Sequence, residues 1–270
     1  MRIIKNTIRR SFLYPMLKTA VIHRNMKKWT RQDQEMFDFY SQFIGPGDLC
    51  FDIGANMGNR VRIFLKLGAR VVAVEPQRRC GRFLLKHFGN EDRFVLVPKA
   101  LGEREGLSEM MISNESALSS LSEEWIRKVQ ESGRFKDSQW HKKQIVFLIT
   151  LDGLIEQMGM PSFMKIDVEG YEYPVLKGLT RPVRTLSLEF TPEFMDATCQ
   201  CIAHLSSLGD IRLNYAIGET MALALSEWVM PEAMIDVLEG QRNGDLFGDV
   251  YVRFKSENDA VKDHRKEPIL

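Results

Sequence analysis

The length, composition and charge of the chain exclude several classes of protein. Its 270 residues are 44% hydrophobic and 27% charged, which is typical of a folded globular protein rather than a disordered one. A formal net charge of +1 provides no field over the whole protein that would recruit nucleic acid. No run approaches the roughly 18 uninterrupted apolar residues of a membrane-spanning helix, and no internal repeat predicts a solenoid. We therefore expect a soluble α/β protein.

Cysteine and histidine do not form a recognisable metal or redox motif. The four cysteines match neither a C-x-x-C pair nor a four-ligand zinc site: Cys50, Cys80, Cys199 and Cys201. The five histidines are scattered along the chain without paired-ligand spacing. We expect free thiols in a reducing cytoplasm and no metal chemistry by these residue types.

The first 44 residues form a basic arm by composition. Met1–Arg31 contains nine Lys or Arg and no acid, and its apolar residues follow helical spacing: Ile4, Ile8, Phe12, Leu17 and Val21. Pro15 and Lys18 interrupt any apolar core of a secretory signal, so that interpretation is excluded. Two interpretations remain open. The arm is either a helix packed on the domain or an amphipathic helix that rests on the inner, cytoplasmic face of an anionic membrane.

From Gly45 onward, apolar runs alternate with amphipathic stretches. Helices are expected over Asn59–Leu67 and Gln77–Phe88. Strands are expected over Asp48–Ile53, Arg70–Val74, Phe94–Val97, Ile145–Ile149, Phe163–Val168, Thr185–Phe190, Ile211–Ile217 and Asp249–Phe254. This alternation predicts βαβ units and a mostly parallel sheet over residues 45–254. Residues 255–270 are mostly charged or polar and are predicted to be a tail.

Residues 114–143 are too long for an ordinary turn and carry a helix signal of their own. Ser120-x-x-Glu123 has the pattern of a capping box, and apolar residues then recur every four positions: Leu121, Trp125 and Val129. Long insertions in compact domains are usually functional or disordered. A helix with an aromatic stripe favours a lid over the substrate side of the domain.

The segment after the first predicted strand contains the first candidate cofactor residues. It reads FDIGANMGN over residues 51–59 and opens directly into a predicted helix. Glycines such as Gly54 and Gly58 let the backbone turn tightly and a ligand lie against it, with Asn56 between them. The spacing is neither G-x-G-x-x-G nor G-x-x-x-x-G-K-[ST], which disfavours phosphate binding. Asp52 can instead accept a hydrogen bond from a cationic amine.

A second acid, Glu75, follows the second predicted strand and precedes Pro76. It lies 21 residues past Gly54, where a carboxylate reaches the hydroxyls of an adenosine ribose. S-adenosylmethionine (SAM) has an amino group, a ribose and a sulfonium but no phosphate, so two such acids suit it better than NAD. After the third strand, Ala100 and Leu101 are expected to lie beside the adenine.

The most distinctive string is MKIDVEGYE, over residues 164–172. It ends a predicted strand with many ionisable groups, at the edge where open α/β sheets bind ligands. Further motifs occur in order along the chain: DIGANMG at 52–58, VEP at 74–76, TLDGL at 150–154, VLKG at 175–178 and LEF at 188–190. With these motifs, residues 45–254 resemble the FkbM family of SAM-dependent methyltransferases.

The resemblance implies a fold and a cofactor. The fold is the Rossmann-like class I methyltransferase sheet, with seven mostly parallel strands and helices on both faces. Asp52, Gly54 and Asn56 would line the methionine end of SAM, and Glu75 would bind the ribose. Asp167 would face both the sulfonium and the acceptor.

The resemblance does not decide the catalytic base. Glu169 and Glu189 are the best candidates by position, because each lies at the carboxyl end of a predicted strand. Lys165 shares a strand face with Asp167 and either pairs with it or holds the acceptor oxygen. A divalent ion held by Asp167 and Glu169 is an alternative, but no third ligand is evident, so no metal is assigned. Glu169 and Glu172 are equally explained as acids capping a helix N-terminus.

These observations predict methyl transfer from SAM to an acceptor hydroxyl, with a carboxylate that removes the proton. The family resemblance implies that the acceptor is a sugar, a glycolipid or a natural product. If the basic arm contacts a membrane, a lipid-linked sugar is the expected acceptor. Two alternatives remain: a SAM-binding protein without turnover, and an NAD-dependent oxidoreductase, which the missing G-x-G-x-x-G disfavours.

Overall fold

The computed structural model describes residues 28–240 and 246–255. Most of the basic arm, residues 1–27, and the tail beyond Lys255 lie outside the described residues, so the helix and the membrane contact predicted there stay predictions. Within the described ranges, no helix is both long enough and apolar enough to cross a membrane. All four cysteines are free, as the sequence predicted.

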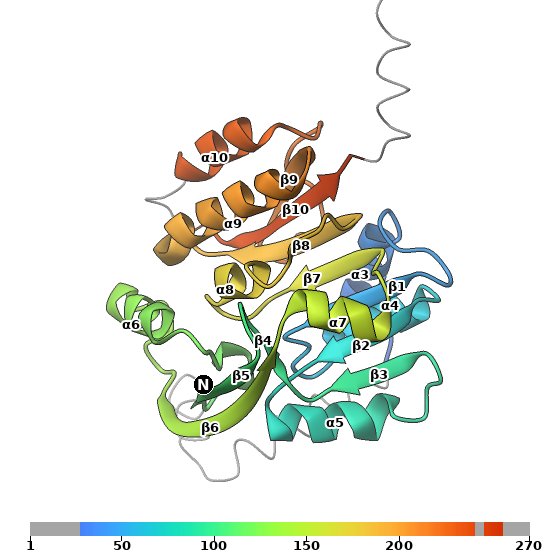
Figure 1. Ribbon diagram of the computed structural model, residues 1–270, viewed down its shortest axis with the longest axis vertical. Coiled ribbons are helices and arrows are strands. Elements are labelled where there is room, and N and C mark those ends of the chain that lie inside the picture. The colour runs from blue at the N-terminus through green and yellow to red at the C-terminus, as the bar shows by residue number, and fades with distance from the viewer. Residues whose placement is uncertain (1–27, 241–245, 256–270) are drawn as a thin grey trace, which may run out of the picture.

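A seven-stranded sheet forms the centre of the molecule, in the order β3-β2-β1-β7-β8-β10-β9 (Figure 1). Its strands are β1 (Leu49–Ile53), β2 (Arg70–Val74), β3 (Phe94–Val97), β7 (Phe163–Ile166), β8 (Thr185–Phe190), β9 (Ile211–Ile217) and β10 (Gly248–Phe254). The five strands from β3 to β8 run parallel, whereas β10 is antiparallel to both neighbours. The predicted mostly parallel sheet of seven strands is confirmed. Chain order reverses between β1 and β7, which is where such sheets open a ligand crevice.

Helices cover both faces of this sheet (Figure 1), because its strands are apolar on both sides. One face packs against α7 (Leu151–Met158), α8 (Glu172–Leu176), α9 (Met195–Leu208) and α10 (Pro231–Glu239). The opposite face packs against α3 (Arg31–Tyr40), α4 (Asn59–Lys66) and α5 (Arg78–Phe88). Strand alternation divides β2 between the two cores: Val72 and Val74 lie in the first, and Val71 and Ala73 in the second.

Residues 31–44 belong to the second core, although the sequence analysis placed them in the basic arm. Phe43 stacks on Tyr251 with ring centroids 5.2 Å apart, and on Phe163 with centroids 5.6 Å apart. Tyr40 is fully buried beside them. The domain therefore begins before Gly45, because α3 and the residues that follow it supply part of its aromatic core.

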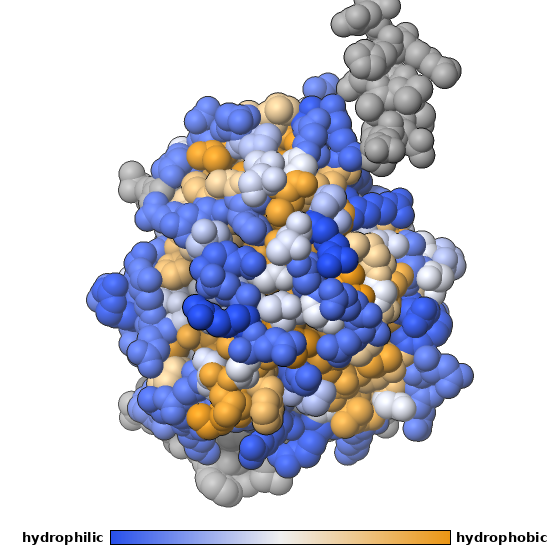
Figure 2. Space-filling model, viewed as in Figure 1, coloured by the Kyte–Doolittle hydropathy of each residue, from blue (hydrophilic) through white to orange (hydrophobic). Residues whose placement is uncertain are grey.

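A second, three-stranded sheet was not predicted. Its order is β4-β6-β5, with β4 (Ala100–Leu101), β5 (Gly106–Ser113) and β6 (Trp140–Ile149). The strand expected over Ile145–Ile149 is the end of β6 and belongs to this sheet rather than to the central one. Its outer face is partly apolar, since Leu107, Ile145 and Phe147 are exposed, and Figure 2 shows an apolar patch over this region.

The predicted insertion connects β5 to β6 and contains η1 (Ser116–Leu118) and α6 (Glu123–Ser132). Trp125 and Val129 are buried, as the periodicity indicated. The predicted capping box is wrong, because the N-cap is Ser122, whose hydroxyl accepts a hydrogen bond from the Trp125 amide. Ser120 Oγ instead donates to the carbonyl of Glu169, 2.6 Å away, and so joins the insertion to the loop after β7.

Candidate active site

One pocket of about 400 Å³ lies over the reversal in chain order, at the carboxyl ends of β1, β2, β7 and β8. Eleven of the twelve predicted site residues line it: Asp52, Gly54, Asn56, Glu75, Pro76, Ala100, Leu101, Lys165, Asp167, Glu169 and Glu189. These residues come from segments more than 100 positions apart in the chain, and the parallel strands bring them to one edge.

Gly58 is the predicted site residue that does not line the pocket. It caps the N-terminus of α4 with a left-handed φ of +80°. A Cβ there would lie 2.7 Å from Leu84 Cδ2 and 2.7 Å from Phe88 Cε2, on α5. The structure therefore gives Gly58 a role in packing α4 against α5, and its predicted cofactor contact stays a prediction.

Gly54 allows the loops after β1 and β7 to touch. A Cβ at this position would lie 1.8 Å from the carbonyl oxygen of Asp167, and the φ of +84° is itself left-handed. The Asp167 amide donates to the Ile53 carbonyl, 3.0 Å away, which joins the same two loops. Only glycine fits here, because any side chain would displace the backbone that carries Asp167.

Asp52 lies on β1 with 3% of its surface exposed. Its Oδ2 atom is buried and has no hydrogen-bond partner within the described part of the chain. Burial raises the pKa of Asp52 to about 6, and the charges of Arg60 and Lys165 oppose that rise. A buried carboxylate oxygen without a partner fits a cationic amine, which would satisfy the oxygen and favour its ionised form.

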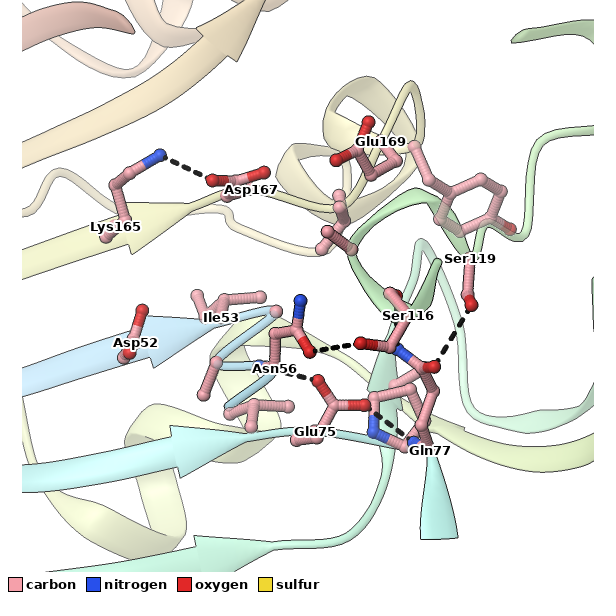
Figure 3. Close-up of a pocket in the computed structure, with 18 of the residues that line it drawn as sticks. Asp52, Ile53, Asn56, Glu75, Gln77, Ser116, Ser119, Lys165, Asp167 and Glu169 are labelled. Carbon is pink, nitrogen blue, oxygen red and sulfur yellow. Dashed lines mark hydrogen bonds and ion pairs between the residues drawn. The ribbon is translucent and has the colours of Figure 1, made fainter. Parts of the chain in front are cut away.

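Glu75, at the end of β2, is held by the backbone on both of its oxygens (Figure 3). The amide of Asn56 donates to Oε2, and the amide of Gln77 donates to Oε1, each at 2.7 Å. Burial raises its pKa to about 7 against these two bonds. An ionised carboxylate accepts about four hydrogen bonds, so Glu75 keeps acceptor capacity for a diol such as the hydroxyls of a ribose.

The insertion reaches the cofactor side of the pocket through side chains that the sequence analysis missed. Gln77 Nε2 donates to the Ser116 carbonyl at 3.0 Å, and Ser119 Oγ donates to Gln77 Oε1 at 3.0 Å (Figure 3). Ser116 Oγ donates to Asn56 Oδ1 at 2.9 Å. Gln77 could have been found from the sequence, because it directly follows the V-E-P motif. The sequence contained no comparable sign for the serines, because their contacts depend on how the insertion folds.

Three carboxylates meet at the other end of the pocket. One oxygen from each of Asp167, Glu169 and Glu189 lies within 4.8 Å of the other two. Burial, and after it the neighbouring acids, raise the pKa of Glu169 and of Glu189 well above the ordinary value. Oxygens at this spacing can hold a divalent cation or share a proton. Glu189 therefore adds a third carboxylate to Asp167 and Glu169, which the sequence analysis did not group with them.

Lys165 is paired within the protein. Its Nζ donates to Asp167 Oδ2 at 3.1 Å and to Asp249 Oδ1 at 2.8 Å. Burial lowers the pKa of Lys165, but Asp167 and Asp249 outweigh it, and the pKa stays well above its ordinary value. The sequence analysis predicted that Lys165 either pairs with Asp167 or holds the acceptor oxygen, and the structure shows the pairing. Asp249 was missed because it lies 84 residues away, on an antiparallel strand.

Arg60 supplies a second cation to the pocket and was also missed. Its Nη2 donates to both carboxylate oxygens of Glu219, at 2.9 and 2.7 Å, and its Nε donates to the Tyr40 hydroxyl at 3.1 Å. Glu172 lies in the first turn of α8, where the sequence analysis placed an acid, but it makes no capping hydrogen bond. Its Oε1 accepts instead from the amide of Val168, which precedes the helix, at 2.9 Å.

This strand order, with one acid at the end of β1 and another at the end of β2, defines a Rossmann-like class I methyltransferase. A match to the methyltransferase FkbM domain over residues 52–221 then places the chain in a particular family, and the chain belongs to it. S-adenosylmethionine is accordingly its cofactor. No curated protein sequence matches the chain.

Several solved structures are distantly similar. Precorrin-6y C5,15-methyltransferase from Geobacter metallireducens is 10% identical with a TM-score of 0.44, over 83% of this chain and 90% of that one. An O-methyltransferase from Bacillus cereus, in complex with SAH, is 10% identical with a TM-score of 0.40, over 84% and 83%. Fibrillarin from Aeropyrum pernix, with bound S-adenosyl-L-methionine, is 11% identical with a TM-score of 0.37, over 78% and 68%.

Proposed function

We propose that this methyltransferase acts on a hydroxyl oxygen, in an acceptor that is a sugar, a glycolipid or a natural product. The observation that carries the proposal is the meeting of Asp167, Glu169 and Glu189 at one end of the cofactor pocket. A hydroxyl is a weak nucleophile until its proton is removed, and a positioned carboxylate contributes about 10²–10⁴-fold to such a step. When bound, SAM supplies an activated methyl group and its own leaving group.

The side chains divide the work along the pocket. Asp52 binds the amino group and Glu75 the ribose, because each is a buried carboxylate with acceptor capacity left over. The side-chain carboxylates of Glu169 and Glu189 form no hydrogen bond or ion pair with a described residue, and their raised pKa makes either one a stronger base than an ordinary carboxylate. Lys165 acts through Asp167, which it holds toward the acceptor end.

The three carboxylates act as one proton-accepting group. The acceptor hydroxyl hydrogen bonds to Glu169 or Glu189 and gives up its proton as the new carbon–oxygen bond forms. The charge of Asp167 adds to burial in raising the pKa of Glu169 and of Glu189, and a shared proton relieves the repulsion among the three acids.

The experiment is incubation of the full chain with SAM and a panel of glycans, glycolipids and hydroxylated small molecules, followed by mass spectrometry. The expected result is the gain of one methyl group on oxygen in at least one acceptor. Thermal stability measured separately with SAM and with NAD distinguishes the alternatives. Stabilisation by SAM without methyl transfer to any acceptor would favour the binding protein, and stabilisation by NAD alone would favour the oxidoreductase.

A further inference from the structure

A groove at the amino edge of the central sheet gathers basic side chains. It has a volume of about 660 Å³ and lies where β8 and β9 begin and β10 ends, at the edge opposite the cofactor pocket. Its charged lining residues are all basic: Arg184, Arg212, Arg253 and Lys255. We call this the amino-edge groove. No part of the proposed methyl-transfer machinery lies in it.

The register of the sheet forces like charges together. Arg253 on β10 lies directly opposite Arg212 on β9, and opposite Thr185 on β8 at its other side. Arg184 precedes Thr185, and burial and then the charge of Arg184 lower the pKa of Arg253. Like charges directly opposite in a sheet destabilise it, so this arrangement costs the fold free energy unless an anion is present.

Within residues 28–240 and 246–255, Asp210 is the carboxylate that pairs with two of these four cations. Asp210 pairs with Arg212 through Oδ1, and its Oδ2 lies 3.5 Å from Lys255 Nζ. In the described residues, no carboxylate pairs with Arg184 or Arg253. The groove therefore keeps two guanidinium groups whose charge the described chain leaves uncompensated.

Aromatic side chains hold one of these guanidinium groups in place. The Cζ atom of Arg253 lies 4.1 Å from the centroid of Trp228 and 5.2 Å from that of Phe43. Trp228 is itself positioned by the next residue, since Val229 and Leu213 exchange two backbone hydrogen bonds of 2.8 Å. A guanidinium stacked in this way keeps its in-plane N–H donors free for a ligand, and little entropy is lost when they bind.

We propose that the amino-edge groove binds a phosphate group, of a phosphate monoester or a diphosphate. The planar fork of arginine matches phosphate oxygens two at a time, and a doubly charged anion suits two uncompensated guanidinium groups better than a carboxylate does. Such a phosphate belongs either to a small phosphorylated molecule or to a lipid headgroup. The site is separate from the methyl-transfer pocket, so the proposal stands or falls independently of the proposed function.

The test is calorimetric titration of the full chain with pyrophosphate and with inorganic phosphate at low salt, beside sedimentation with vesicles of phosphatidic acid or of phosphatidylcholine. The first variant is Arg184→Gln, which removes an exposed guanidinium and leaves the core intact. Its matched control is Arg70→Gln, an exposed arginine at the amino end of β2, outside the groove. Arg253→Lys keeps the charge but removes the fork.

Saturable binding is expected, weakened roughly 10- to 100-fold by Arg184→Gln and unchanged by Arg70→Gln. Arg253→Lys should weaken it as well, and SAM-dependent methyl transfer should be the same in all variants. Binding of the soluble anions assigns the site to a small molecule. Binding of phosphatidic acid vesicles alone, with the same difference between variants, assigns it to a headgroup. Absence of binding to every probe, or equal weakening by Arg184→Gln and Arg70→Gln, would overturn the proposal.

Discussion

At the carboxyl edge of the central sheet, six acids and two cations line the pocket, whereas at the amino edge the charged lining residues of the groove are all basic. A single stripe on β10 connects the two edges: Asp249 pairs with Lys165, Tyr251 is buried in the middle, and Arg253 ends in the groove. The formal net charge of +1 hides this separation.

The sign of the charged lining residues therefore differs between the two edges of this sheet, in keeping with the ligand proposed for each edge. An acid-lined pocket suits a cofactor that carries an ammonium and a sulfonium, and burial raises the carboxyl pKa values within it. A base-lined groove suits an anion. Because helices and core separate the two edges, each can be changed without altering the other, and the predictions below use that independence.

The largest effect is expected at the three acceptor-side carboxylates. Glu189→Gln or Glu169→Gln should bind SAM normally, yet the one that accepts the proton should transfer methyl about 10²–10⁴-fold more slowly. Asp167→Asn should slow transfer too, because it removes one of the two carboxylate partners of Lys165. Single-turnover rates with saturating SAM measure this. Glu103→Gln, an exposed acid outside the pocket, is the control, and parental rates in all three variants would move the chemistry elsewhere.

The next effect is on cofactor affinity. Glu75→Ala should weaken SAM binding by about 1.5–3 kcal/mol for each charged hydrogen bond to the ribose that is lost. Calorimetry with SAM measures the change, and circular dichroism checks that the sheet still forms. Glu91→Ala, on an exposed turn after α5, should leave the affinity unchanged. Equal SAM affinity in Glu75→Ala and the parent would refute the assignment of the ribose site.

A substitution at Gly58 distinguishes the packing of α4 on α5 from the binding of SAM, because both were assigned to the same loop. Gly58→Ala should destabilise the fold by about 1–3 kcal/mol, because its Cβ would collide with Leu84 and Phe88 and the backbone there is left-handed. SAM affinity of the folded protein should stay within about twofold of the parent. Chemical denaturation and calorimetry together measure the two quantities. A large loss of affinity without a loss of stability would restore the predicted cofactor contact.

A further effect is on the pH dependence of stability. Folding raises the pKa of Glu75 from 4.5 to about 7, so the folded state binds a proton more tightly than the unfolded state. Without cofactor, stability should therefore fall as the pH rises from about 4.5 to 7. Thermal unfolding of the parent and of Glu75→Gln measures this, and the variant should show the shallower slope.

SAM affinity should change with pH in the opposite direction. Asp52, with a pKa of about 6, must ionise to bind an ammonium, so affinity should rise as the pH passes from 5 to 7. Calorimetry at several pH values tests this, and Asp52→Asn should remove most of the dependence. A pH-independent affinity in the parent would count against an amine beside Asp52.

Much of the cofactor half could be predicted because its signals are local. Asp52 and Gly54 follow one strand, Glu75 follows the next, and parallel strands bring their carboxyl ends to one edge regardless of the remaining contacts. The packing role of Gly58 was not predicted, for a related reason. A glycine in a motif reveals a backbone requirement, but not whether a ligand or a neighbouring helix imposes it.

The acceptor half was predicted only in part. The sequence indicated a helix in the insertion, yet not the small sheet that carries it, because β4 has two residues and pairs with a strand about 50 positions away. The capping box failed at Ser120 because its hydroxyl finds a tertiary partner, the Glu169 carbonyl, which outweighs the local pattern.

By itself, the sequence determined the seven strands of the central sheet and the family, and it placed Asp52 and Glu75 at the ends of two strands, since periodicity and short motifs depend on neighbours along the chain. Only the tertiary structure decided that Asp249 balances Lys165, that Glu189 joins Asp167 and Glu169, and that Arg253 lies opposite Arg212. The physical reason is register. Pairing between distant strands fixes which charged groups face one another, and that pairing is set by packing of the whole sheet.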